Sequence, residues 1–277
     1  MNYRILFILL LGIIFMSSCR QQPEVEEIQN VYENLHAVLW MQKSAEYKAN
    51  CLQAYKLAEL KMQSALKNRK WTAALEQNGN YLNLPAAVIL DVDETVLDNS
   101  PYEAELIQTG DHYSSSTWNA WCNKAAAEAI PGALEFCRSA DQQGITVFYV
   151  TNRRDHLKEV TRKNLKQLGF PLKENVETIL PRLESSDKGT RREIISENYR
   201  ILLLIGDNLG DFASGFTNGS MQSRDSLLTE YKDYFGTKWI SLPNPVYGDW
   251  EGALFEYNYG LNDEEKLNIK MNLLIRK

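Results

Sequence analysis

The chain has 277 residues, of which 44% are hydrophobic and 24% charged, and its formal net charge is −6. This composition is typical of a globular protein, and the length fits one large α/β domain with additions or two small domains. The chain has no excess of basic residues, which argues against a nucleic-acid polymer as its partner.

The first residues have the pattern of an export signal. Arg4 precedes an apolar run over residues 5–16, which is too short to span a bilayer but is typical of a signal peptide. The next residues, Met-Ser-Ser-Cys, resemble a bacterial lipobox that ends at Cys19. This resemblance implies that residues 1–18 are removed and that Cys19 carries a lipid; the alternative is an ordinary signal peptide with a chance cysteine. We therefore expect a lipid-anchored protein of the bacterial cell envelope, with residues 19–27 as a short tether.

Three further cysteines follow: Cys51, Cys122 and Cys137. Three thiols can form at most one internal disulfide. None lies in a CxxC pair or near a histidine cluster, so no zinc site is expected. We predict that all three are small buried hydrophobic side chains.

Residues 28–80 form the first predicted structural unit. From about residue 28 to residue 67 there is no Gly or Pro, and apolar residues recur at helical spacing. This pattern predicts two helices with a break near Asn50. A turn follows at residues 78–80, Asn-Gly-Asn.

The pattern changes in residues 81–277 to short apolar runs that alternate with helical stretches. Such alternation is typical of a parallel sheet with helices on both faces, so the predicted fold is a doubly wound α/β sheet. An insert over about residues 101–130 is too long for a plain connection and is predicted to form a small cap. The predicted strands are 86–90, 146–150, 176–180, 201–205 and 238–242, and the predicted helices are 131–143, 156–168, 188–198 and 263–275.

Polar side chains gather where the predicted strands end. Ligands of a doubly wound sheet bind beyond the carboxyl ends of its strands, so these side chains are expected to meet at one edge. In chain order after the first four strands they are Asp91 and Asp93, then Thr151 and Asn152, then Lys188, then Asp207 and Asp211.

These residues together have the chemistry of a phosphoryl-transfer site. Asp91 and Asp207 supply hard oxygen ligands that suit Mg²⁺, and this cation would neutralise the crowded carboxylates. Asp91 would attack phosphorus, while Asp93 would protonate the leaving oxygen and then deprotonate the attacking water. Each group alone has an ordinary alternative, such as an acidic turn or a surface lysine. Groups expected to bind the phosphate oxygens are Thr151, Asn152 and Lys188.

Two long motifs resemble the signatures of a known family. Residues 89–100 read ILDVDETVLDNS, and residues 204–212 read LIGDNLGDF. Both resemble the haloacid dehalogenase (HAD) superfamily and, more narrowly, the class C acid phosphatases, which include the lipoprotein e nucleotidases. The likeness extends from about residue 39 to residue 252.

The resemblance implies a role for each acidic residue. Asp91 would be the nucleophile, Asp93 the acid/base and Asp207 a metal ligand. Mg²⁺ is the implied cofactor, with the backbone carbonyl of Asp93 as a further ligand and Asp211 acting through water or by supporting the ligands. The resemblance also implies an outer-membrane location, and a homodimer is left open.

Aromatic residues in two segments are candidates for substrate recognition. By resemblance to similar nucleotidases, Trp118 in the insert and Tyr247 after the fifth strand are expected to stack on a base or aryl group. The expected substrates are then nucleoside 5′-monophosphates, nicotinamide mononucleotide and aryl phosphates. The alternative for both rings is a place in the cap core. Two alternative functions follow: a broad-specificity acid phosphatase, and a binding lipoprotein that keeps the fold without turnover.

Overall fold

The computed structural model describes residues 33–275. The predicted signal peptide, the lipidation site at Cys19 and the tether lie outside the described residues. Within residues 33–275, no helix combines the length and apolar character that a bilayer span requires. The described cysteines, Cys51, Cys122 and Cys137, are all buried, as predicted, and none of them is paired in a disulfide.

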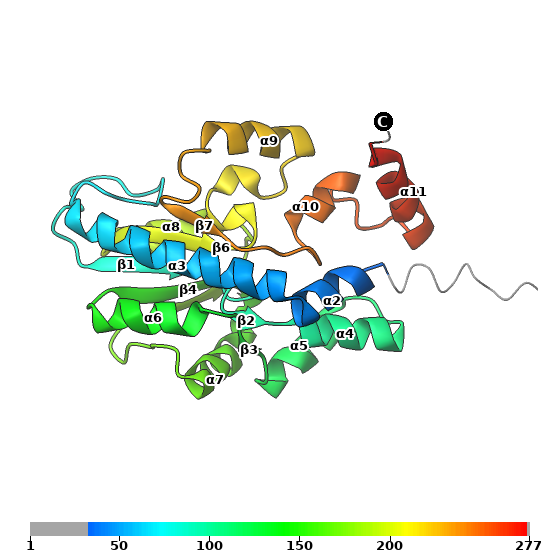
Figure 1. Cartoon of the computed structure of the whole chain (residues 1–277), viewed down its shortest axis with the longest axis horizontal. Coiled ribbons are helices and arrows are strands. Elements are labelled where there is room, and N and C mark those ends of the chain that lie inside the picture. The colour runs from blue at the N-terminus through cyan, green and yellow to red at the C-terminus, as the bar shows by residue number, and fades with distance from the viewer. Residues whose placement is uncertain (1–32, 276–277) are drawn as a thin grey trace, which may run out of the picture.

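A five-stranded parallel sheet forms the centre of the molecule, in the order β5-β4-β1-β6-β7 (Figure 1). The predicted doubly wound fold is confirmed. β6 is buried along its whole length, which explains its uninterrupted apolar sequence. The strands are β1 (Ala86–Leu90), β4 (Thr146–Arg154), β5 (Ile179–Arg182), β6 (Arg200–Gly206) and β7 (Trp239–Ser241).

Helices cover both faces of the sheet because successive strand residues point to opposite sides. In β1, Val88 and Leu90 join a core with α3 and α6, whereas Ala87 and Ile89 join a second core with α8 and the segment after β6. Figure 1 shows α3 and α6 running across one face. The helices are α2 (Leu35–Lys43), α3 (Ala45–Lys67), α4 (Ser100–Thr109), α5 (Ser115–Lys124), α6 (Ala133–Gln142), α7 (Lys158–Leu168), α8 (Gly189–Ser196), α9 (Met221–Glu230), α10 (Asp249–Gly252) and α11 (Asp263–Leu273).

The break between the first two helices is at Ser44, and the prediction of a break near Asn50 was wrong. Ser44 has extended backbone angles, and its Oγ accepts a hydrogen bond of 3.0 Å from the Tyr47 amide. It therefore caps the N-terminus of α3, which continues through Asn50. Helical periodicity continues across this junction, so only the capping residue marked it.

Two strands differ by more than one residue from their predicted bounds. β5 begins at Ile179 rather than at residue 176, and β4 continues to Arg154 instead of ending at residue 150. The extra β4 residues are held by pairing of Arg154 with Arg182 at the end of β5. The helix α9 was not predicted; its sequence has few apolar residues, and only Arg224 of this helix is buried.

The insert forms a small cap above the carboxyl edge of the sheet. It consists of α4, α5 and a two-stranded antiparallel ribbon of β2 (Leu97–Asp98) and β3 (Glu128–Ala129). The ribbon begins within the loop that follows β1. The cap is therefore built directly onto the loop that carries Asp91 and Asp93.

Candidate active site

The loop after β1 is rigidly held. The Asp91 amide donates to the Ile205 carbonyl at 2.9 Å, which continues the pairing of β1 with β6. The amides of Val96 and Leu97 both donate to the Val92 carbonyl at 2.9 Å, and Tyr55 Oη of α3 donates to the Thr95 carbonyl at 2.6 Å. The loop thus turns tightly after Asp91.

The loop after β6 places two more carboxylates beside Asp91. The Asn208 amide donates to Asp211 Oδ2 at 3.0 Å, which folds Asp211 back over the strand end. Gly206 makes this close approach possible, because a Cβ there would lie 2.6 Å from the Asp211 Cβ. Asp207 is fixed at both oxygens, by Thr95 Oγ1 at 3.1 Å and by Asn244 Nδ2 at 2.9 Å.

Asp91, Asp207 and Asp211 therefore form one acidic cluster, in which one carboxylate oxygen from each lies within 4.8 Å of the others. Burial, together with the charges of Asp211 and Asp91, raises the pKa of Asp207 well above its usual range. Three hard oxygens this close fit a divalent cation, which would offset their repulsion. The Asp93 side chain is not a member of this cluster, so the expected metal role of Asp93 stays a prediction that concerns its backbone carbonyl.

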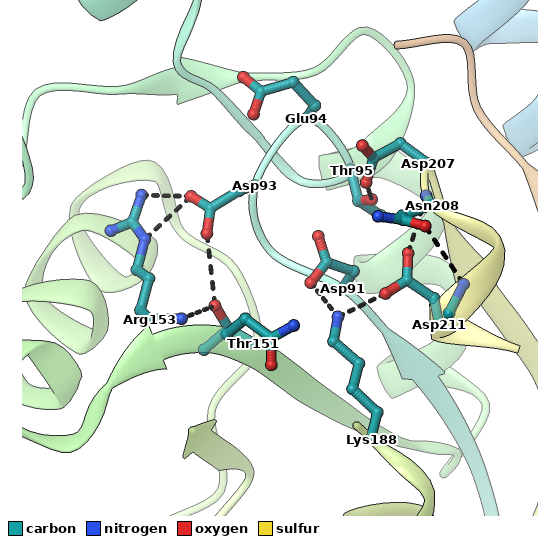
Figure 2. A network of polar contacts seen from close by, with 12 residues as sticks. Asp91, Asp93, Glu94, Thr95, Thr151, Arg153, Lys188, Asp207, Asn208 and Asp211 are labelled. Carbon is teal, nitrogen blue, oxygen red and sulfur yellow. Dashed lines mark hydrogen bonds and ion pairs between the residues drawn. The ribbon is translucent and has the colours of Figure 1, made fainter. Parts of the chain in front are cut away.

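Lys188 lies between two of these carboxylates, as Figure 2 shows. Its Nζ pairs with Asp91 Oδ1 and, at 2.6 Å, with Asp211 Oδ1, and the residue is only 3% exposed. Burial lowers the Lys188 pKa, but the charges of Asp211 and Asp91 outweigh this effect and raise it. Burial raises the pKa of Asp91 to about 7, with Lys188 opposing the shift and Asp211 and Asp93 adding to it. Lys188 is thus a fixed positive charge beside Asp91.

Asp93 points away from the cluster toward a separate set of donors (Figure 2). Arg153 donates to Asp93 Oδ1 through Nε at 2.9 Å and Nη2 at 2.8 Å, and Asn99 Nδ2 donates to the same oxygen at 2.9 Å. Thr151 Oγ1 is 3.3 Å from Asp93 Oδ2. One carboxylate oxygen is therefore saturated by donors, whereas Oδ2 has a single long hydrogen bond.

Sequence reasoning missed Arg153 as a site residue. It follows Thr151 and Asn152 at the end of β4, so the same strand-end argument could have found it. Arg153 is 3% exposed, and its pKa is raised because the charge of Asp93 outweighs the effect of burial. The structure also gives Thr151 a contact that was not predicted, with Asp93. Asn152 is exposed, and its Oδ1 accepts a hydrogen bond of 2.8 Å from Arg191.

Both predicted stacking residues line a cavity of about 560 Å³ that opens onto Asp91 and Asp93. Trp118 packs edge-on against Tyr102 at 5.2 Å, and the Arg153 guanidinium lies 5.5 Å from its ring centre. Tyr247 Oη donates to the buried Glu94 carboxylate. Each ring thus contacts both the cavity and a residue that supports the catalytic loop.

Trp121, the other cap tryptophan, is 8% exposed and donates from Nε1 to Asn99 Oδ1 at 2.8 Å. Since Asn99 also donates to Asp93, Trp121 supports the Asp93 environment from within the cap.

Comparison with known proteins identifies the family of this chain. The chain matches the acid phosphatase family, subfamily IIIB of the HAD superfamily, over residues 15–250. The structure resembles the class C acid phosphatase of Bacillus anthracis with a TM-score of 0.80 and 37% identity, covering 91% of this chain and 99% of that one. A structure of that phosphatase with tungstate bound gives a TM-score of 0.78, again at 37% identity over 91% and 99% of the two chains.

Among curated proteins, acid phosphatase 1 of Solanum lycopersicum is 27% identical over 168 residues, which is 57% of each chain. The chain spans less than two thirds of the length of the curated relatives it matches. The match over residues 15–250 covers most of the sequence, and the chain belongs to the subfamily IIIB acid phosphatases of the HAD superfamily.

Proposed function

We propose that this protein is a Mg²⁺-dependent acid phosphomonoesterase that works through a phosphorylated Asp91. The observation that supports the proposal most is that two carboxylates only two residues apart in the sequence have different surroundings. Asp91 lies in a cluster with Lys188, Asp207 and Asp211, while Asp93 is bound by Arg153. A nucleophile and an acid/base need such different surroundings.

The donor set fits Mg²⁺, which Asp91 and Asp207 would hold together with the backbone carbonyl of Asp93, with the Asp211 carboxylate beside them, directly or through water. When bound, the ion would supply positive charge that neutralises these carboxylates and the phosphate oxygens. Lys188 contributes a second, permanent positive charge to the same position. It reduces the repulsion between Asp91 and an incoming phosphate dianion, and it can donate to the equatorial oxygens.

In the first half-reaction, an Asp91 carboxylate oxygen forms a bond to phosphorus and the bond from phosphorus to the leaving oxygen breaks. Asp93 Oδ2 gives its proton to that leaving oxygen, so the substrate departs as an alcohol or phenol. Water then attacks phosphorus, Asp93 accepts its proton, and inorganic phosphate leaves Asp91. Arg153 and Asn99 hold Asp93 in position through Oδ1, which leaves Oδ2 for the proton.

Tungstate in the related class C phosphatase supports a phosphate-binding site in this one, because tungstate is an oxyanion like phosphate. A carboxylic acid donates a proton only in its protonated form, so activity is expected to peak at acidic pH, where the positive charges of Lys188 and of a bound cation would keep Asp91 ionised. Activity that peaks above neutrality would contradict the role of Asp93.

The proposed substrates are nucleoside 5′-monophosphates, nicotinamide mononucleotide and aryl phosphates. Support comes from Trp118 and Tyr247, whose rings line the cavity beside the catalytic residues. A broad-specificity phosphatase is the second candidate, favoured by the packing of Trp118 on Tyr102, which could serve the cap alone.

The cell-envelope location and lipid anchor are further proposals, supported by the sequence around Cys19. A Cys19→Ser variant should be released as soluble, active enzyme, whereas retention in the membrane fraction would contradict the anchor. The homodimer is likewise a proposal, and light scattering of the purified protein tests it.

The function is tested by hydrolysis of phenyl phosphate with and without EDTA. Release of inorganic phosphate that EDTA abolishes and added Mg²⁺ restores is expected. Release that EDTA does not change would contradict the metal requirement. Binding of phenyl phosphate without any turnover would favour the alternative of a binding lipoprotein.

A further inference from the structure

Two cations in the cavity wall, Arg182 and Lys266, have no carboxylate partner among residues 33–275, and Arg182 differs from Lys266 in having a buried donor without an acceptor. Lys188 pairs with Asp91 and Asp211, and Arg153 pairs with Asp93. Lys270 of α11 pairs with Glu33 and Glu251. Arg182 also lines the cavity, but no carboxylate in residues 33–275 lies within ion-pair distance of its guanidinium, and its Nε is buried without a hydrogen-bond partner.

Such a group is unusual, because a buried guanidinium donor without an acceptor is energetically unfavourable. Arg182 ends β5 at the same edge of the sheet that carries the catalytic residues. Its planar guanidinium can donate two parallel hydrogen bonds to one phosphate or carboxylate group. Arg182 thus has the chemistry of an anion-binding group, and one of its donors has no protein acceptor.

Two neighbours add to this chemistry. The strand pairing places Arg154 opposite Arg182, and Arg154 is exposed and forms no ion pair within the described part of the chain. Tyr113, in the loop between the two cap helices, lines the same cavity. Burial raises the pKa of its phenol, while a hydrogen bond with Ser115 and the positive charges of Arg154 and Arg182 oppose that rise.

Elsewhere the cavity wall carries carboxylates, of which Glu251 pairs with Lys270 and Asp263 with His112. Glu103, Glu251 and Asp263 line it, and burial together with the charge of Glu251 raises the pKa of Glu103 to about 7. An anionic group on a bound substrate would be repelled from those residues. Lys266 could also attract it, but among the described cavity-lining cations only Arg182 has a buried donor without an acceptor.

We infer that Arg182, with Arg154 and Tyr113, forms a subsite for a second anionic group on the leaving portion of the substrate. The inference rests on the proposed phosphatase function and narrows its substrates to phosphomonoesters with another phosphate or carboxylate. In the sheet order, β5 is two strands from β1, which is about 10 Å at the usual strand spacing. This is a backbone separation, and the long Arg182 side chain can cover part of it toward the second anion of a nucleoside bisphosphate or a phosphorylated hydroxy acid.

The test compares substrates that differ only in the second anion. Adenosine 3′,5′-bisphosphate is paired with adenosine 5′-monophosphate, and the carboxyphenyl phosphates are paired with phenyl phosphate. The first pair reports a second phosphate and the second pair a carboxylate. For each pair, the ratio of kcat/KM for the doubly anionic substrate to that for its partner is measured in wild type, Arg182→Ala and Arg182→Lys.

The ratio is expected to fall about tenfold in Arg182→Ala, which is the loss of one charge-assisted interaction, and to be partly kept in Arg182→Lys. Arg154→Ala should lower it less, because Arg154 is the more exposed. Arg69→Ala removes the same charge from an exposed site outside the cavity and is the matched control; it should leave the ratio unchanged. Thermal unfolding of each variant separates misfolding from loss of the subsite.

An unchanged ratio in folded Arg182→Ala, in both substrate pairs, would overturn the subsite. So would a fall of the same size in Arg69→Ala, because the effect would then come from net charge. Neither result bears on the phosphatase proposal. That proposal fails if wild type hydrolyses neither phenyl phosphate nor adenosine 5′-monophosphate.

Discussion

The two ends of the cavity are built in different ways. At the catalytic end, side chains leave from strand ends and are buried and paired: Lys188 is 3% exposed and Asp91 8%. At the leaving-group end, most side chains come from the cap and from loops, joined by Arg154 and Arg182 from the ends of β4 and β5, and Tyr113 is 64% exposed. The difference suggests a division of labour in which the sheet supports the reaction and the inserted segments select the substrate.

The catalytic end should be intolerant of small chemical changes. Asp91→Asn removes the nucleophile with almost no change of shape, so activity is expected to fall on the order of 10⁴-fold or more. Phosphate release is measured on phenyl phosphate at saturating Mg²⁺, and the melting temperature checks that the variant is folded. Substantial residual turnover in folded Asp91→Asn would contradict the claim that the catalytic end depends on this carboxylate.

The second carboxylate should show a different signature. Asp93→Asn cannot donate a proton, and a loss of about 10²- to 10⁴-fold is expected for alkyl phosphates. The loss should be smaller for p-nitrophenyl phosphate, whose leaving group departs without a proton. Rates are compared over a series of leaving groups of different basicity. Equal losses across the series would mean that Asp93 supports the loop and does not act as the acid.

Changes at the leaving-group end should depend on the substrate. Trp118→Ala is expected to lower kcat/KM for nucleotides and aryl phosphates by about 5- to 150-fold, the loss of one stacking contact, while sparing glycerol phosphate. A side-by-side substrate panel measures this effect. If kcat/KM falls equally for all substrates, Trp118 belongs to the cap core. Its contacts with Tyr102 and Arg153 would then explain the loss.

The same end should show a pH effect on stability without an effect on chemistry. The pKa of Glu103 is raised from 4.5 to about 7 by burial and by Glu251, so the folded state holds a proton that the unfolded state releases. Stability is therefore expected to fall as the pH rises from about 4.5 to about 7 and then to level off. Glu103→Gln should reduce this fall, as read from melting temperatures across the range.

Glu105→Gln is the matched control for that variant, because Glu105 lies on the same helix but is exposed and paired with Lys124. It should leave the pH dependence as in wild type. If Glu103→Gln and Glu105→Gln behave alike, the Glu103 side chain is not the source of the pH dependence.

The strand-end argument predicted most of the catalytic end because parallel strands bring their carboxyl ends to one edge whatever the helices do. This argument predicted that Asp91, Thr151, Lys188 and Asp207 lie close together. It could not show that Arg153 binds Asp93, because the pairing of β4 with β5 is irregular between Val150 and Arg154 and sequence patterns do not report such irregularities. The break at Ser44 was missed for a similar reason, since the capping residue lies in an otherwise continuous helical pattern.

The leaving-group end was less predictable. Its residues come from segments whose relative positions follow from packing, such as the cap loop with Tyr113 and the pairing of Arg154 with Arg182. Sequence patterns report local periodicity, and they carry little information on such long-range contacts. The family resemblance pointed to Trp118 and Tyr247, but their contacts with Arg153 and Glu94 emerged only from the structure.

The central claim is that Asp91, and not Asp93, carries the phosphoryl group. It is tested most directly by quenching the enzyme in acid during turnover, reducing the acyl phosphate with borohydride and locating the reduced residue by peptide mass spectrometry. The account predicts that residue 91 is converted to homoserine, and that this product is absent without substrate and in Asp91→Asn. Reduction at residue 93, or at no aspartate while the enzyme turns over, would contradict it.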